Sequence, residues 1–237
     1  RFFSLGVCCV AGCFGHAEDR PLPPAERGRI VERLKGWGFN TAGAWSRPSV
    51  WPDLYVADQI YTGFEYGKDD PFVESFWSGW FPRQVEGETA AFRGKPNVAG
   101  YFVDNEHKWD PGETMKTTLA LPAGAPARRA LEAFKAGRAA EAPEALARAW
   151  RTEVAKTYYS RYVALVRKFD PDHLILGVRW AGLPDADLYD ALSPLFDVNS
   201  VNDYTRYGAV RPAYAERYAE TGKPIMITEW SFSGFPA

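Results

Sequence analysis

The 237-residue sequence predicts an α/β protein built as a (β/α)8 TIM barrel. Three observations support this fold class. Strand-like apolar runs alternate with helical segments, which is typical of repeated βα units and a parallel sheet. No glycine-rich phosphate loop follows the first strand, which disfavours a doubly wound dinucleotide-binding fold. The predicted strands also end in polar and aromatic residues, as expected where a barrel carries its functional groups.

Apolar runs bounded by glycine, proline and polar clusters define the strands. They predict seven strands, at residues 2–10, 39–45, 54–61, 98–103, 173–180, 196–204 and 224–230. A barrel of this kind needs eight, and an eighth strand does not fit after Ala237. We therefore expect this chain to lack the eighth βα unit of the barrel.

Apolar residues at helical spacing predict helices between these strands. The clearest covers residues 144–169, and others cover 25–37, part of 71–92, 186–195 and 211–221. Residues 110–143 are rich in proline, glycine, alanine and arginine and predict an excursion with a short helix at 128–136. Because no serine- or glycine-rich linker interrupts the chain, we expect one catalytic domain over residues 1–237.

Charge and hydropathy exclude several classes of partner. The chain has 28 Lys and Arg against 30 Asp and Glu, a net charge of −2, so neither a nucleic acid nor an anionic membrane is an expected partner. No apolar run approaches the roughly 18 residues of a membrane-spanning helix. Aromatic residues make up 15% of the chain, which suits stacking on sugars or bases.

The cysteines predict neither a disulfide framework nor a metal site. All three, Cys8, Cys9 and Cys13, fall within six residues, and only three histidines are scattered along the chain. Small buried thiols near the first strand are the expected outcome. The sequence therefore predicts no metal and no cofactor.

Two glutamates stand at the ends of predicted strands. Glu106 closes the strand at 98–103 through a short polar segment, and Glu229 ends the strand at 224–230. If the barrel closes, both carboxyl groups rim one mouth. Such a pair performs glycoside hydrolysis: one group protonates the leaving oxygen, while the other attacks the anomeric carbon or activates water. A lone glutamate at a strand end is more often a solvated carboxylate, so the prediction depends on the pair.

These two strands also carry a family resemblance. Residues 100–106 (GYFVDNE), with Trp109 close behind, resemble the acid/base strand of retaining β-glycosidases of the large (β/α)8 clan. They are most similar to its β-agarase and β-galactosidase-like members. Residues 225–230 (IMITEW) resemble the nucleophile strand of the same clan, and residues 2–7 and 38–41 resemble the first two strands of agarase-like sequences. The resemblance spans residues 2–232.

The resemblance implies a role for each matching residue. Glu106 would be the general acid/base and Glu229 the nucleophile, while Asn105 would bind the sugar 2-hydroxyl and Tyr204 would keep the nucleophile ionised and oriented. The implied activity is retaining double displacement at β-glycosidic bonds of a poly- or oligosaccharide such as agarose or another galactan. An extracellular or periplasmic location is implied by the resemblance alone.

The other candidate substrate-binding residues lie at or just beyond strand ends: Trp45, His107, Trp109, Arg179, Trp180 and Trp230. The tryptophans are expected to stack on sugar faces, although a tryptophan at a strand end also serves as a barrel plug. Arg179 or Arg47 is the expected cation beside Glu229. His107 and Lys108 place two potential cations next to the acid/base, a departure from agarase-like relatives.

Two alternative functions stay open at this stage. One is a carbohydrate-binding barrel without turnover, against which the two intact glutamates argue. The other is a barrel enzyme of unrelated chemistry; metal-dependent hydrolysis would need a His/Asp cluster at strand ends, where only His107 qualifies. A carbohydrate is the expected partner under the leading hypothesis.

Overall fold

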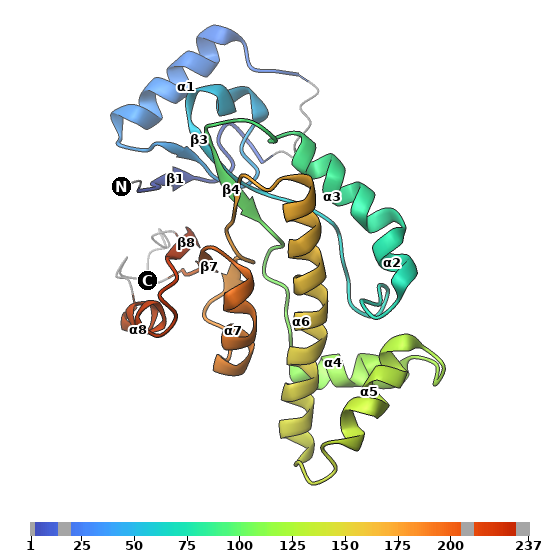
Figure 1. Cartoon of the computed structure of the whole chain (residues 1–237). Helices are drawn as coiled ribbons and strands as arrows, with labels where there is room; N and C mark the ends of the chain where they lie inside the picture. The colour runs from blue at the N-terminus through green and yellow to red at the C-terminus, as the bar shows by residue number, and fades with distance from the viewer. Residues whose placement is uncertain (1–2, 14–19, 205–210, 231–237) are drawn as a thin grey trace, which may run out of the picture.

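The computed structural model describes residues 3–13, 20–204 and 211–230 of an α/β protein (Figure 1). Five strands form one parallel sheet in the order β1–β2–β3–β4–β5, and three form a second in the order β6–β7–β8. The strands are Gly6–Val7 (β1), Thr41–Ala42 (β2), Tyr55–Gln59 (β3), Val98–Phe102 (β4), Leu174–Ile175 (β5), Trp180–Ala181 (β6), Asn199–Asn202 (β7) and Ile225–Glu229 (β8). The predicted α/β class with parallel strands is confirmed.

Helices connect the strands close to the predicted positions. They are α1 (Pro24–Gly36), η1 (Pro48–Asp53), α2 (Glu74–Ser78), α3 (Trp80–Ala90), α4 (Pro111–Ala120), α5 (Pro126–Ala136), α6 (Pro143–Phe169), α7 (Ala186–Leu192), η2 (Ser193–Leu195) and α8 (Pro212–Thr221). Many of them begin with a proline, whose fixed φ suits the first helical turn. Gly222 ends α8 at φ 64°, a left-handed conformation that glycine adopts without strain.

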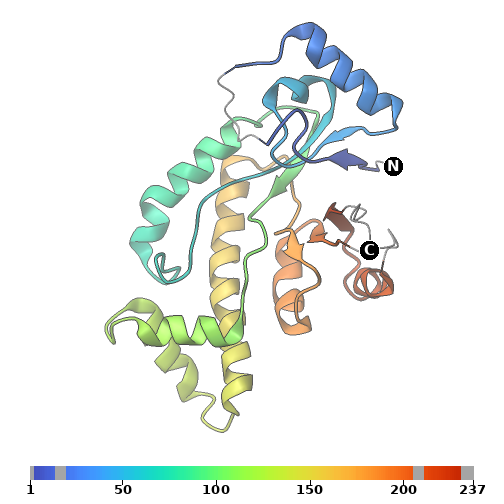
Figure 2. The ribbon, with the colours of Figure 1, turned by 180° about the vertical axis from the view of Figure 1, so that it is seen from behind.

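The long helix α6 runs beside the first sheet and continues well beyond it, as both ribbon views show (Figures 1 and 2). Its 27 residues extend about 40 Å at 1.5 Å per residue. Fully buried side chains recur along it at four-residue spacing: Trp150, Val154, Tyr158, Tyr162 and Val166. Neither α6 nor another described helix has an apolar stretch long enough to cross a membrane.

The predicted excursion at 110–143 contains two helices rather than one. α4 and α5 pack against the end of α6 that lies away from the sheets (Figures 1 and 2). Trp150 of α6 anchors them: its indole Nε1 donates to Thr118 Oγ1 at 2.8 Å, and its ring stacks on Phe72. The sequence prediction of a single helix missed α4, where Asp110 caps the first turn by accepting from the Glu113 amide.

The prediction of one continuous strand at 173–180 is wrong, because this segment forms both β5 and β6. Gly177 and Arg179 adopt φ values of 86° and 50°, which interrupt the extended backbone. The segment still pairs with the end of β4: Leu176 N donates to Tyr101 O at 2.7 Å, and Val103 N donates to Gly177 O at 2.9 Å. The segment from β5 to β6 therefore connects the two sheets directly.

A small apolar cluster links both sheets. Ala44, Ala57, Phe102 and Leu176 are buried in it, and Cys8, Trp45, Val198 and Met226 pack around them. These residues come from segments at both ends of the chain and from the middle. Cys8, just after β1, also donates through its Sγ to the carbonyl oxygen of Thr228 in β8 at 3.4 Å. The first and last described strands therefore lie close together.

The prediction of three buried thiols is wrong for two of the cysteines. Cys9 and Cys13 form a disulfide in the loop that follows β1, whereas Cys8 is a free, half-buried thiol. Cys9, Ala11 and Gly12 all have positive φ values, so the chain turns sharply enough to bring two cysteines four residues apart into contact. Spacing alone does not reveal such a turn.

Candidate active site

Polar side chains meet near the carboxyl ends of β4, β7 and β8, and one more comes from the segment between β5 and β6. Glu106 lies beyond β4, Arg179 precedes β6, Asn202 ends β7 and Glu229 ends β8. Arg179 donates to Glu229, Asn202 donates to Glu106, and both Arg179 and Asn202 donate to Asn105 Oδ1, which links the two pairs into one network. The two glutamates predicted from strand-end positions are thus brought to a common site.

Glu229 is held by two donors of different kinds. The Arg179 guanidinium donates through Nη2 to Glu229 Oε1, and the Tyr204 hydroxyl donates to Glu229 Oε2. The Glu229 side chain is 18% exposed, so these charge-assisted bonds act with limited solvent screening. The hydrogen bond to Glu229, helped by burial and by the charges of Glu229 and Glu106, raises the pKa of Tyr204 to about 12. Tyr204 therefore remains a donor at neutral pH.

Arg179 is the buried cation of the site. Its side chain is 1% exposed, and its guanidinium lies between the rings of Trp45 and Phe102, with Cζ 4.6 Å and 5.0 Å from their centroids. While Nη2 contacts Glu229, Nε donates to Asn105 Oδ1 at 2.8 Å. The planar fork thus fixes a carboxylate and an amide at once, which a lysine ammonium cannot do.

Glu106 receives a neutral donor instead of a cation. Asn202 Nδ2 donates to Glu106 Oε1 at 2.9 Å, and Thr228 Oγ1 orients the same amide by donating to Asn202 Oδ1 at 2.7 Å. The two carboxyl groups therefore have different partners. One is bound by a guanidinium and a phenol, and the other by an amide.

The backbone at this site is unusual. Six non-glycine residues have positive φ values within the described ranges, and four of them are here: Trp45 (60°), Asp104 (131°), Glu106 (52°) and Arg179 (50°). Such conformations cost about 1–3 kcal/mol each and persist where the surroundings hold them, often at active sites. Their concentration beside the glutamates supports a functional role for this cluster.

His107 is neutral in the folded protein. Burial lowers its pKa to about 4, and its ring lies among the rings of Phe64, Trp109 and Tyr158. Of the two potential cations expected beside Glu106, His107 is therefore buried among rings, whereas Lys108 is exposed.

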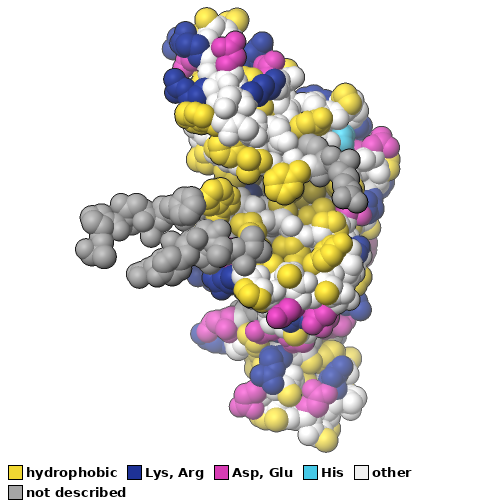
Figure 3. All heavy atoms as spheres, turned by 90° about the vertical axis from the view of Figure 1, so that its left-hand side faces the viewer, with side chains coloured by type: hydrophobic (Ala, Val, Ile, Leu, Met, Phe, Trp, Pro, Cys, Tyr) yellow, Lys and Arg dark blue, Asp and Glu magenta, His cyan; other side chains and the backbone are white. Residues whose placement is uncertain are grey.

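The predicted tryptophans divide into two groups. Trp45 covers Arg179 and so lies at the site, whereas Trp230 follows Glu229 in the sequence and is 48% exposed. Trp109 and Trp180 are only 7% and 5% exposed and pack against Tyr159 in the core. Because both rings are buried, they do not form sugar platforms in this structure. Hydrophobic side chains do gather in the middle of the face shown in Figure 3.

Sequence reasoning missed two residues of this network. Asn202 contacts both Glu106 and Asn105, and the half-buried thiol of Cys8 lies near Glu229 and Arg179, where burial raises its pKa despite the nearby guanidinium. Asn202 could have been found, because it lies two residues before Tyr204 at the same strand end. Nothing in the sequence marks Cys8 as a neighbour of β8.

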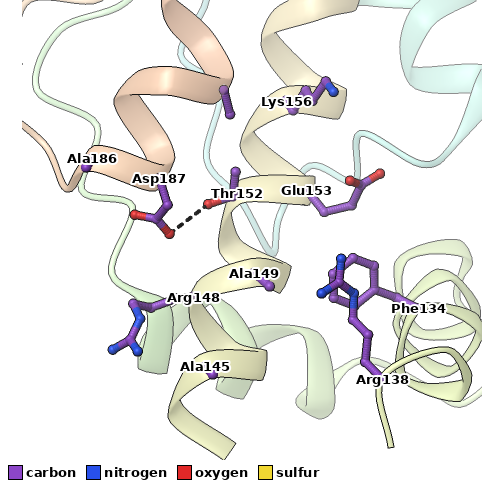
Figure 4. A pocket seen from close by; sticks show the side chains of 11 residues that line it. Phe134, Arg138, Ala145, Arg148, Ala149, Thr152, Glu153, Lys156, Ala186 and Asp187 are labelled. Carbon is purple, nitrogen blue, oxygen red and sulfur yellow. Dashed lines mark hydrogen bonds between the residues drawn. The ribbon is translucent and has the colours of Figure 1, made fainter. Parts of the chain in front are cut away.

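Two hollows on the surface lie elsewhere. One, of about 590 Å³, opens between α5, α6 and α7, with Arg138, Arg148 and Lys156 near Glu153 and Asp187 (Figure 4). Another, of about 400 Å³, lies near Tyr55 and Asn97, where β3 and β4 begin. Neither hollow is lined by Glu106 or Glu229. The convergence of charged and amide groups identifies the candidate site, whereas the volume of the surface hollows does not.

Across the described ranges, no group of three or more His, Cys, Asp or Glu side chains has a metal-binding arrangement.

Comparisons with known proteins point in the same direction as the motifs. No protein-family model matches the chain. The chain is 24% identical to β-agarase B of Vibrio sp. (strain JT0107) over 257 aligned residues, covering 85% of the chain and 26% of that protein. It is 29% identical to β-agarase A of the same organism over 112 residues, covering 38% of the chain and 11% of that protein. The chain thus spans about a quarter or less of these relatives.

Solved structures share the fold. An exo-β-agarase matches with a TM-score of 0.71 at 19% identity, over 90% of this chain and 36% of that one. The agarase AgWH50C matches with a TM-score of 0.69 at 22% identity, over 89% and 36%. A β-galactosidase from Marinomonas ef1 matches at 0.55 and 12% identity, over 92% and 43%. The predicted resemblance to agarase-like β-glycosidases is confirmed, at distant identity.

Proposed function

We propose that this chain forms the catalytic domain of a retaining β-glycoside hydrolase acting on agarose or another galactan. The observation that carries the proposal is the unequal environment of two neighbouring carboxyl groups. Glu229 accepts hydrogen bonds from the Arg179 guanidinium and the Tyr204 hydroxyl, whereas Glu106 accepts one from the neutral amide of Asn202. Retaining hydrolysis needs one ionised nucleophile and one group that gives and takes a proton.

The proposed mechanism follows from these contacts. The Glu229 carboxylate attacks the anomeric carbon while Glu106 protonates the departing glycosidic oxygen, which leaves a glycosyl ester on Glu229. Water, deprotonated by Glu106, then displaces Glu229 and gives a product with the original β configuration. Arg179 holds the Asn105 amide through its oxygen, so the Asn105 NH2 group is available to the sugar 2-hydroxyl.

The proposed architecture is a (β/α)8-type barrel with the site at its mouth. The small apolar cluster around Phe102 contains residues from both sheets, and the Cys8–Thr228 contact brings β1 close to β8. Agarose or a related galactan is proposed as substrate because the curated relatives are β-agarases. Trp45 and Trp230 are proposed to stack on the sugar rings.

Two substitutions in the full-length protein test this function. Glu229→Ala should abolish turnover of every substrate, because no nucleophile remains. Glu106→Ala should lose about 10²–10⁴-fold on galactan oligosaccharides but much less on aryl β-galactosides, whose leaving groups need little protonation. Azide should restore the Glu106→Ala rate on aryl substrates by attacking the glycosyl ester, which releases a β-glycosyl azide and the free Glu229 carboxylate.

Glu113→Ala is the matched control, because Glu113 is an exposed carboxylate on α4 and should leave activity unchanged. NMR of the first-formed product should show the β anomer. An α anomer would exclude retention. Tight binding of galactan without turnover by the unmodified protein would instead favour a carbohydrate-binding barrel.

A further inference from the structure

Asp104 lies two residues before Glu106 and faces the opposite side of the chain from the catalytic groups. It is 4% exposed, whereas Asn105, the next residue, faces Arg179. The Asp104 carboxyl lies near the Tyr158 and Tyr159 hydroxyls of α6 and near Thr62, and its Oδ2 is 3.5 Å from His107 Nδ1. The Asp104 side chain thus joins the segment carrying Glu106 to the longest helix of the protein.

Burial favours the neutral form of the Asp104 carboxyl. Burial raises its pKa well above the ordinary range, and the hydroxyls of Tyr158, Tyr159 and Thr62 only partly oppose this. The titratable groups that face it are His107, which burial keeps neutral, and the tyrosines of α6, Tyr158, Tyr159 and Tyr162, whose pKa values are raised by burial. A neutral carboxylic acid can donate as well as accept a hydrogen bond.

The backbone between Asp104 and Glu106 needs an external support. Both residues have φ values that favour glycine, 131° and 52°, yet both carry side chains. Two main-chain bonds hold the segment, from Val103 N to Gly177 O at 2.9 Å and from Glu106 N to Arg179 O at 3.3 Å. The second bond is long and therefore weak. The buried Asp104 side chain, on the other face of this segment, adds to the restraint on its backbone.

We propose that Asp104 is a positioning residue that holds the bend at 104–106 against α6 and thereby sets the place of the Glu106 carboxyl. This inference rests on the proposed role of Glu106 as acid/base. Asp104 does not touch the substrate; it acts through Glu106 and through His107.

Substitutions in the full-length protein test the proposal. Asp104→Asn preserves the shape and the donor and acceptor of a neutral carboxyl, so kcat should stay within about threefold of the original. Asp104→Ala removes the support, and kcat should fall about 10²-fold on galactan oligosaccharides but only a few-fold on activated aryl galactosides, because acid catalysis is what misplacement of Glu106 removes. A defect in folding alone would lower both rates equally.

Asp170→Asn is the matched control. Asp170 is a buried aspartate at the end of α6, where it accepts from the Tyr101 hydroxyl and contacts His173 Nδ1 at 2.7 Å. This variant should lower stability without changing the dependence on leaving group. Glu106→Gln, assayed in parallel, separates the two hypotheses: if it shows no leaving-group dependence, the proposed function fails.

Several outcomes would overturn the role of Asp104 alone. One is an equal loss by Asp104→Ala on both substrate classes while Glu106→Gln discriminates between them. Another is a loss of about 30-fold or more in a folded Asp104→Asn variant, which would mean that the charged form is required. The Asp104→Asn result decides the matter by itself if Asp104→Ala does not fold.

Discussion

Arg179 shows how much of this site depends on the geometry of one side chain. Its guanidinium is buried between two rings and uses separate nitrogens for Glu229 and Asn105. The same residue has a positive φ, so the backbone turns where the side chain enters the site. A positive charge at this position is therefore not sufficient to hold both Glu229 and Asn105. The planarity and orientation of the guanidinium matter as well.

Arg179→Lys should lower kcat/KM by about 10–100-fold, because a lysine keeps the charge but loses at least one charge-assisted bond worth about 1.5–3 kcal/mol. Steady-state kinetics on a galactan oligosaccharide provide the measurement. Arg161→Lys is the matched control: Arg161 makes a two-pronged contact with Glu74 at 2.8 and 3.0 Å, on the exposed surface of α6. Loss of this Arg161–Glu74 contact should leave kcat/KM unchanged. Equal effects of the two substitutions would contradict the role of Arg179.

Some site residues are predictable from the sequence and others are not. Glu106 and Glu229 follow long apolar strands, so strand-end reasoning finds them. Trp180 also ends an apolar run, but Arg179 just before it has φ 50°, which breaks the alternation of faces and directs Trp180 towards Tyr159 in the core. Backbone reversals of this kind leave no signal in hydropathy, because non-glycine residues occupy them.

At the scale of elements, close contact between strands β4 and β5 requires a glycine. Gly100 pairs with Leu174, and a Cβ atom on Gly100 would lie 2.2 Å from the Leu174 carbonyl oxygen. No side chain fits at that distance without separating the strands. Because the bend that carries Glu106 follows β4, this close approach also positions the proposed acid/base.

Gly100→Ala should destabilise the protein by about 3 kcal/mol or more, since the obstacle is a main-chain atom that cannot rotate away. Urea denaturation followed by circular dichroism measures the change. Gly28→Ala provides the opposite case: Gly28 lies inside α1 with no atom near the added methyl group, and helix propensity predicts a gain of about 1 kcal/mol. A Gly100→Ala protein as stable as the original would show that β4 and β5 are not this close.

The long helix was the easiest element to predict, and the junction of the sheets was the hardest. Apolar residues at three- and four-residue spacing over 144–169 match α6 within one residue at its start. The separation into β5 and β6 depends on Gly177 and Arg179, in a segment that reads as continuously apolar up to residue 178. Local conformation there is set by contacts with β4 and with Ser200 of β7, whose Oγ accepts from Arg179 N at 2.8 Å.

At the scale of the whole molecule, buried titratable groups near the site make stability depend on pH. His107 binds a proton near pH 6.5 when unfolded but only near pH 4 when folded. The unfolded state therefore binds more protons between these values, and stability falls as pH drops through this window, by about 3 kcal/mol in total. Asp104 acts with the opposite sign, because its raised pKa keeps it protonated in the fold while the unfolded chain ionises above about pH 4.

Two variants should separate these contributions in thermal melts from pH 4 to 8. His107→Asn should remove the loss of stability on acidification, so its melting temperature should rise relative to that of the original protein as pH falls from 6.5 to 4. Asp104→Asn should show the reverse: its melting temperature should equal that of the original protein near pH 4 and exceed it increasingly as pH rises. Lys108→Gln, at an exposed neighbouring position, should differ from the original by a constant amount. Parallel pH curves for all four proteins would contradict both assignments.

The positive φ values at Trp45 and Glu106 have a consequence for how this sequence tolerates change. Glycine would occupy either position with a relaxed backbone, but it would remove the ring over Arg179 or the proposed acid/base. Stability and activity therefore pull in opposite directions at these positions. A random library sorted only for thermal resistance should accumulate glycine there, whereas one sorted for galactan cleavage should keep tryptophan and glutamate, so the divergence of the two populations would itself mark the functional centre.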